Sequence, residues 1–222
     1  MGIISIEKAN NLYWLGRYSQ RVYRTIKDFF RGYDLMLDRN HIAYQAFCEM
    51  MNIPDVYGSR EVFIENYPYD TDNPDSILSN LYRAFDNALV MREYITSESL
   101  SFIQLAIFSM KTAKGSDAPL MALQDVLDHL LAFWGCLDET IDDAETRNLI
   151  KFGKAMEHLD IELRVNSSEA VVRRCFDRMT FYLRQTDIDF NAEDFYALGY
   201  HIIGENRDYK KALEHLMVMV NL

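Results

Sequence analysis

Helical periodicity constrains this chain more than any other feature of its sequence. In the N-terminal segment, apolar side chains recur at every third or fourth position, a spacing that places them on one face of an α-helix. They are Leu12, Leu15, Val22, Ile26, Phe29, Tyr33 and Leu37. Only four prolines and nine glycines interrupt the 222 residues, which favours long helices over many short strands. We therefore predict an all-α fold, a single-domain helical bundle over residues 1–222.

The same periodicity predicts the order of the remaining helices. The clearest linker is AKGSDAP at 113–119, which divides the bundle into a first half (1–112) and a second half (119–222). Two shorter helices, separated near 204–207, are expected at the C-terminus. The other expected helices cover about 40–51, 59–66, 74–111, 119–145, 146–165 and 167–185.

The opening segment recurs later in the chain. Residues from Asn11 onward align without gaps with residues from Asn148 onward, at a constant offset of 137 positions (148 − 11). Gly16 is thereby matched to Gly153. Because glycine lets backbones approach closely, we expect two pseudo-repeated long helices that pack side by side.

Composition excludes several classes of protein. The net charge of −11 disfavours general nucleic-acid binding, since an acidic surface repels phosphate. No apolar stretch is expected to reach the ~20 residues of a membrane span, and the N-terminus lacks the features of a signal peptide. The three cysteines are widely spaced and odd in number, which is typical of reduced thiols. The sequence predicts a cytoplasmic protein that binds neither membrane nor nucleic acid.

The first helix carries an unusual stripe of cations opposite its apolar face. Like charges one turn apart repel each other, so either solvent, a carboxylate-rich neighbouring helix or an anionic ligand must relieve them. The aromatic rings of Tyr13, Trp14 and Tyr18 flank the stripe and are placed to cover cationic groups. The stripe consists of Arg17, Arg21, Arg24 and Arg31.

Arg92 lies within the apolar stripe of the helix expected over 74–111, and an unpaired buried guanidinium would be strongly unfavourable. The helix expected over 119–145 carries the complement, with Asp138 and Glu145 on its apolar stripe. We expect Arg92 to meet Asp138, Glu145 or Glu157, in a structural ion-pair network or in a functional polar pocket. The candidate ligand-binding residues of that pocket are Arg17, Arg21, Arg92, Glu93, Glu98, Asp138, Glu157 and His158.

No self-sufficient catalytic motif is present. The sequence has no phosphate-binding glycine loop, no GxSxG elbow and no convincing cysteine–histidine nucleophile. It also lacks the paired Glu-x-x-His motifs of a carboxylate-bridged di-iron bundle. We expect no cofactor and no metal, and the catalytic residues, if any, stay unknown. The least favoured hypothesis is a metal-dependent bundle that uses Glu98, Asp138, Glu157 and His158.

Several blocks of the sequence resemble the Alpha-E family, helical bacterial proteins with a recurring Glu-Arg motif. The first block comprises Asn11, Leu12, Tyr13, Trp14, Gly16, Arg17 and Tyr18. A second block, at a helix start, comprises Asn73, Pro74, Ser76 and Ile77. A third block comprises Arg92, Glu93, Ile95, Ser97 and Glu98.

The Glu-Arg dipeptide itself is altered in both copies. It reads Gln20-Arg21 in the first copy and Glu157-His158 in the second, so one copy keeps the arginine and the other keeps the acid. If the two copies face each other, Arg21 and Glu157 would restore the pair.

The resemblance implies association with ATP-grasp-type ligases and transglutaminase-like proteins in bacterial peptide synthesis or modification. Our first hypothesis is therefore an accessory or interaction component of such a system. The alternative is an enzyme or ligand-binding protein with an Arg/Glu pocket between the two repeats. A further alternative is a structural helical domain that forms a homodimer through its polar stripes.

Overall fold

The computed structural model describes residues 5–38, 43–204 and 207–222, and of residues 34–38 and 43 it describes the backbone alone. The described residues form α-helices joined by turns, with a single-turn 3-10 helix η1 (Tyr67–Tyr69) and an isolated bridge between Phe190 and Val220. The predicted all-α class is confirmed. The α-helices are α1 (Ile6–Asp38), α2 (Ala43–Met51), α3 (Arg60–Asn66), α4 (Ile77–Val90), α5 (Ser97–Ala113), α6 (Pro119–Thr140), α7 (Ala144–Arg164), α8 (Glu169–Leu183), α9 (Ala192–Ile202) and α10 (Tyr209–Val218).

Contacts divide the chain into two compact units that share helix α1. Unit 1 comprises residues up to Arg17 together with 143–222, and unit 2 comprises residues 18–142. The sequence had divided the bundle at the 113–119 linker instead, and the single-domain assignment stays a prediction.

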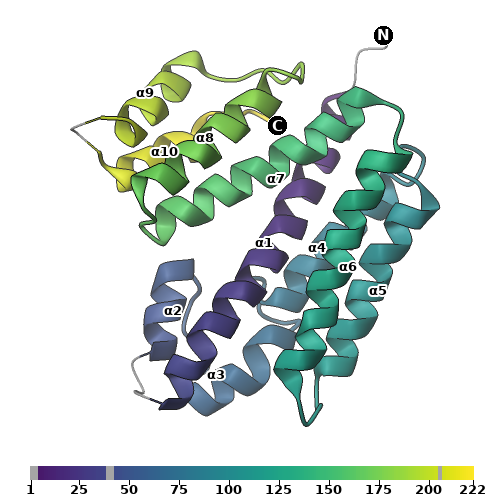
Figure 1. The fold of residues 1–222 in the computed structure, drawn as a ribbon, viewed down its shortest axis with the longest axis vertical. Helices are drawn as coiled ribbons and strands as arrows, with labels where there is room; N and C mark the ends of the chain where they lie inside the picture. The colour runs from purple at the N-terminus through teal and green to yellow at the C-terminus, as the bar shows by residue number, and fades with distance from the viewer. Residues whose placement is uncertain (1–4, 39–42, 205–206) are drawn as a thin grey trace. The chain divides into compact units, whose positions relative to one another are not determined.

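In unit 1, the start of α1 packs on α7. Helix α7 packs against α8 and α10, and α10 against α9, so that α7 is the central helix (Figure 1). The apolar residues of α1 in this unit are buried as the periodicity predicted, with Leu12 and Leu15 fully covered.

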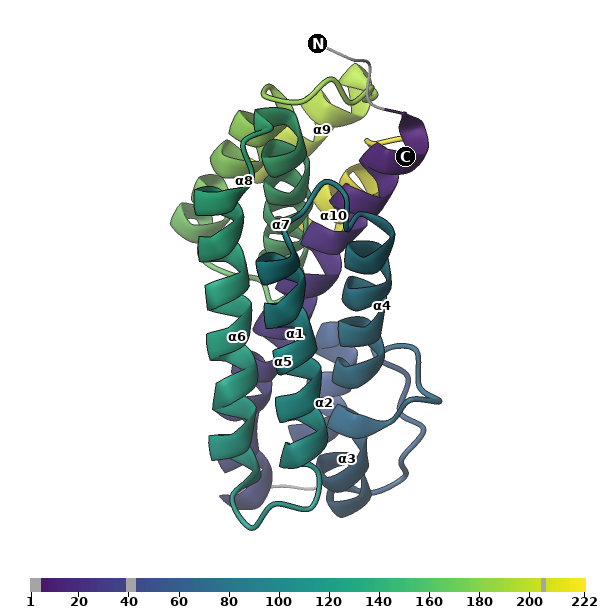
Figure 2. The ribbon, with the colours of Figure 1, turned by 90° about the vertical axis from the view of Figure 1, so that its right-hand side faces the viewer.

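In unit 2, α5 lies along α6 and α4 packs beside α5 (Figure 2). The rest of α1 contributes Val22, Ile26 and Phe29 to the core. The ring of Phe29 lies 6.3 Å from that of Phe63 and 6.5 Å from that of Tyr67, measured between centroids, within a cluster of aromatic rings. The side chain of Leu37, predicted to share this face, lies outside the described residues.

The helix predicted over 74–111 is interrupted. Helix α4 ends at Val90, a turn follows, and α5 begins at Ser97. The physical reason is the cap at Thr96, whose side chain accepts a hydrogen bond from the backbone N–H of Ser99. Apolar periodicity continues across the break because both helices pack into the same core, which concealed the turn.

Helix α6 differs from its prediction in two ways. It ends at Thr140 rather than near 145, and its buried stripe contains Val126, Leu130 and Leu137, whereas Leu131 is half exposed. The stripe predicted for this helix was Leu123, Leu127, Leu131, Trp134 and Ile141, of which Leu123, Leu127 and Ile141 are buried. It began with two steps of four residues, each of which overshoots a full turn by about 40° and which together carried it to the exposed Leu131. The error carried Asp138 onto the apolar face, whereas it is exposed.

The expectation that no stretch reaches membrane-span length was also wrong for α6. This helix has 22 residues and a mean hydropathy of 1.3 over its most apolar window, so by length and composition alone it would cross a membrane. A core helix of a soluble protein has the same properties, and α6 buries one face within unit 2.

Two glycines set the approach of α1 to α7 within unit 1. A Cβ atom added at Gly153 would lie 2.0 Å from the carbonyl oxygen of Tyr13, and one added at Gly16 would lie 2.0 Å from that of Ile150. Each glycine therefore faces the backbone of the other helix, as the predicted side-by-side packing requires. The repeat itself stays a prediction.

We predict that Gly153→Ala destabilises the protein by about 1–3 kcal/mol, because the helices must move apart to admit one methyl group. The matched control is Gly135→Ala in α6, where an added Cβ meets nothing within 4 Å. This control should gain about 0.5–1 kcal/mol from helix propensity. Urea unfolding measures both; a stable Gly153→Ala variant would contradict the close approach.

A second prediction concerns the N-cap of α7. The carboxylate of Asp143 accepts hydrogen bonds from the hydroxyl and backbone N–H of Thr146, and these bonds lower its pKa. We predict that Asp143→Ala costs about 0.5–2 kcal/mol at neutral pH. Because the folded pKa is lowered, this contribution is complete above the usual carboxyl pKa and shrinks as the pH falls through the folded value.

The control is Ser168→Ala at the N-cap of α8, where the side chain makes no capping hydrogen bond. Its effect should be smaller and should not depend on pH in the acidic range. Chemical denaturation at neutral and acidic pH makes the comparison, and a loss of equal size for both variants would contradict the assignment of Asp143.

Candidate functional site

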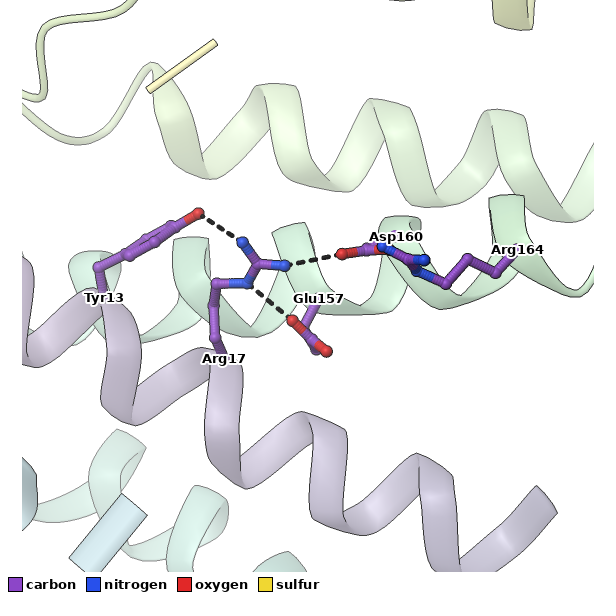
Figure 3. Close-up of polar contacts among 5 residues, drawn as sticks. All are labelled: Tyr13, Arg17, Glu157, Asp160 and Arg164. Carbon is purple, nitrogen blue, oxygen red and sulfur yellow. Dashed lines mark hydrogen bonds and ion pairs between the residues drawn. The ribbon is translucent and has the colours of Figure 1, made fainter. Parts of the chain in front are cut away.

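The most heavily buried charged group within unit 1 centres on Arg17. Helix α1 places Tyr13 and Arg17 one turn apart, and α7 places Glu157 and Asp160 on the face opposite (Figure 3). The side chain of Arg17 is 11% exposed, that of Glu157 1% and that of Asp160 5%. These charges are therefore almost entirely removed from water.

Arg17 spreads its guanidinium over three acceptors. Its Nε donates to Oε2 of Glu157 at 2.7 Å, and its Nη2 donates to Oδ2 of Asp160 at 2.8 Å. Its Nη1 donates to the hydroxyl oxygen of Tyr13 at 3.3 Å. Arg164, one turn beyond Asp160 on α7, pairs with the other oxygen of that carboxylate. Figure 3 shows the guanidinium between the two helices.

Aromatic rings complete the enclosure of Arg17. Its guanidinium carbon lies 5.2 Å from the ring centroid of Trp14 and 5.8 Å from that of Tyr13. These distances are within the range of cation–π interactions. The prediction that aromatic rings cover a cation of the stripe is confirmed for Tyr13 and Trp14. Burial alone would lower the pKa of Arg17, but Glu157, Tyr13 and Asp160 raise it above its ordinary value. The group is a permanent cation held by acids.

The other cations of the α1 stripe lie in unit 2, and different contacts offset the repulsion between their like charges. Arg24 lies 3.6 Å from the buried carboxylate of Asp28, and Arg31 reaches the same carboxylate at 3.1 Å while exposing most of its side chain. Arg21 stands over the ring of Tyr18 at 5.9 Å. Carboxylates of the neighbouring helix α7 therefore offset the charge of Arg17, and contacts within α1 contribute to offsetting the charges of Arg21, Arg24 and Arg31.

The prediction for Arg92 was wrong. Arg92 is exposed and lies with Glu93 in the turn between α4 and α5, and Glu98 is exposed in the first turn of α5. The helix break explains the error, because a residue in a turn does not follow the helical stripe. Arg92 is therefore not the buried cation that the sequence predicted, and Asp138 is exposed as well.

Of the eight predicted ligand-binding residues, the structure joins Arg17 and Glu157 directly. His158 is the next residue on α7 and points to a second contact, with its Nε2 at 3.2 Å from Oε1 of Glu162. The other oxygen of Glu162 accepts a hydrogen bond from the hydroxyl of Ser167. The suggested pair of Arg21 and Glu157 would join unit 2 to unit 1 and stays a prediction.

Sequence reasoning missed Asp160 and Arg164. The signal was available, since Glu157, Asp160 and Arg164 follow three- and four-residue spacings on one helix and share a face with Gly153. Within the described ranges, no three side chains of His, Cys, Asp or Glu are grouped as a metal site would require.

The fold and the site define an all-helical protein in which Arg17 of α1 forms ion pairs with two buried acids of α7, Glu157 and Asp160. Residues 7–187 match the Alpha-E family, described as a predicted alpha-helical domain with a conserved ER motif, and the chain belongs to this family. None of the curated proteins and no solved structure matches the chain. Helices α9 and α10 lie C-terminal to the matched residues.

We predict that Arg17→Met lowers the free energy of unfolding by about 3–5 kcal/mol, because it removes the guanidinium from the buried carboxylate of Glu157 and one of the two cations from that of Asp160. The matched control is Arg207→Met, which breaks an exposed pair with Glu169 and should cost about 0–1 kcal/mol. Thermal and urea unfolding measure both. Equal small losses would show that the Arg17 pair contributes little.

Proposed function

We propose that this protein is an accessory component of a bacterial peptide synthesis or modification system and that it binds an ATP-grasp-type ligase. The family resemblance implies such a partner, and a transglutaminase-like protein is the second candidate. The observation that carries the proposal is the state of Arg17. Its Nε and Nη2 are engaged by Glu157 and Asp160, so the most prominent cation of the family block braces two helices rather than facing a substrate.

This arrangement favours an accessory role over an Arg/Glu catalytic pocket. An anion-binding arginine must offer free N–H groups to its ligand, whereas Nε, Nη1 and Nη2 of Arg17 each already donate a hydrogen bond inside the protein. Recognition of a partner would then depend on surface residues and on the overall charge of the protein. A net charge of −11 disfavours nucleic acid as one of them.

A cytoplasmic location belongs to the same proposal. It is supported by the three cysteines, which are free thiols and buried. Free thiols are typical of a reducing compartment.

We predict that the chain and an ATP-grasp-type ligase encoded beside it elute together from size-exclusion chromatography after co-expression. The double variant Arg17→Met/Glu157→Met should retain this complex, because it removes a buried charge pair together and leaves the surface unchanged. An unrelated acidic helical protein of similar net charge controls for nonspecific association.

Two results would overturn the proposal. One is separate elution of the chain from both the ligase and the transglutaminase-like protein. The other is loss of the complex in a double variant whose circular dichroism and melting show a folded protein, since the network would then take part in binding.

A further inference from the structure

A cavity in unit 2 is lined by none of the residues of the Arg17 network. It has a volume of about 420 Å³, within the range of about 300–1,000 Å³ that is usual for small-ligand sites. Three segments converge on it, all within unit 2: the end of α1, the corner from α3 to η1, and the turn from α5 into α6. In both ribbon views these segments lie at the same end of unit 2 (Figures 1 and 2).

Part of the cavity wall is aromatic and apolar. Phe29, Tyr69 and Leu123 line it and are almost fully buried, so an apolar group inside would lose contact with water on several sides. The ring of Phe29 continues into the aromatic cluster of unit 2, at 6.2 Å from Phe47. The aromatic ring of a ligand would therefore extend a cluster in which Phe29 and Phe47 already pack edge to face.

Two tyrosine hydroxyl groups, those of Tyr33 and Tyr69, add polar groups to the lining of this cavity. Tyr69 is 7% exposed and Tyr33 lies close to it, and within the described ranges neither hydroxyl has a hydrogen-bond partner in the protein. Burial, with a smaller contribution from Tyr33, raises the pKa of Tyr69 to about 12. Its hydroxyl is therefore a protonated donor throughout the physiological range. Because this hydroxyl has no acceptor within the described part of the protein, it is available to donate a hydrogen bond to a ligand.

The mouth of the cavity carries one charge of each sign. Glu65 at the end of α3 and Lys114 after α5 are both exposed and both line the cavity. Among the residues that the structure describes, neither forms an ion pair with another side chain. The pair is suited to a ligand that presents an ammonium group and a carboxylate together.

We propose that this cavity binds an α-amino acid with an aromatic side chain, either free or as the end of a peptide. The ring would lie against Phe29 and Leu123, the ammonium group near Glu65 and the carboxylate near Lys114. The Tyr69 hydroxyl would donate to a ligand oxygen. This site goes beyond the proposed function, because binding here requires no ligase.

The test is isothermal titration calorimetry of the full chain with five small probes. L-phenylalanine carries both charges and the ring, L-phenylalaninamide carries the ammonium group alone, and N-acetyl-L-phenylalanine carries the carboxylate alone. N-acetyl-L-phenylalaninamide has neither charge, and L-alanine lacks the ring. Saturable binding that requires the ring and at least one charge is the expected result.

The two sources of the ligand give different patterns. Tightest binding of L-phenylalanine supports a free amino acid. Equal binding of L-phenylalaninamide, sensitive to Glu65→Gln, supports a peptide N-terminus, and equal binding of N-acetyl-L-phenylalanine, sensitive to Lys114→Gln, supports a C-terminus. Glu65→Gln should weaken the affinity for the probe with the ammonium group by up to about fivefold, and Lys114→Gln should weaken that for the probe with the carboxylate by the same factor. This is the size expected for exposed charge pairs. Glu61→Gln, also exposed on α3 but outside the cavity, is the matched control.

Tyr69→Phe separates binding from folding. It removes only the hydroxyl, so affinity should fall roughly two- to tenfold. The melting temperature should stay the same or rise, because no protein hydrogen bond is lost. Tyr196→Phe, on exposed α9 in unit 1, should change neither quantity. The proposal is overturned if no probe gives saturable heat, if L-alanine binds as well as L-phenylalanine, or if Tyr69→Phe and both charge variants bind every probe as the wild type does.

Discussion

The close approach of α1 to α7 is the constraint on which the rest of unit 1 depends. Gly16 and Gly153 each lie against the backbone of the other helix, and no other residue type leaves that space. The resulting short distance lets the guanidinium of Arg17 reach Glu157 and Asp160 directly. The close packing at the two glycines and the ion pairs of Arg17 therefore arise from the same contact between α1 and α7. The facing residues of these two helices are about 140 positions apart in the sequence.

Buried charge pairs contribute to specificity in a way that apolar contacts do not. Replacing a buried ion pair by apolar groups is often neutral in stability, whereas breaking one is severely unfavourable. Sliding α1 by one turn along α7 would take the guanidinium of Arg17 away from Glu157 and would leave Asp160 with Arg164 of its own helix. The network thus favours one register of the two helices.

Sequence reasoning succeeded where the signal was local or periodic. Spacing alone predicted the all-α class and the burial of Leu12, Leu15, Val22, Ile26 and Phe29 on α1. It failed where tertiary packing masked a local signal. The cap at Thr96 was hidden by an apolar period that runs through the turn, and this error placed Arg92 in the interior. Asp160 was missed because the search followed the repeat instead of the face of α7. The cavity beside Phe29 joins three segments distant in sequence, and no periodicity predicts such a meeting.

Unit 1 is discontinuous in sequence, and this has a consequence for how the chain is made. Ribosomes release the N-terminus first, at about 5–20 residues per second. Every residue of unit 2 has been synthesised once position 142 emerges, whereas the first residues of α1 must wait for α7. Until then Leu12, Leu15 and Arg17 have none of their unit 1 partners from 143 onward. Contacts of such long sequence separation form slowly, so during synthesis the apolar residues at the start of α1 wait longer for these partners than the residues of unit 2 wait for theirs.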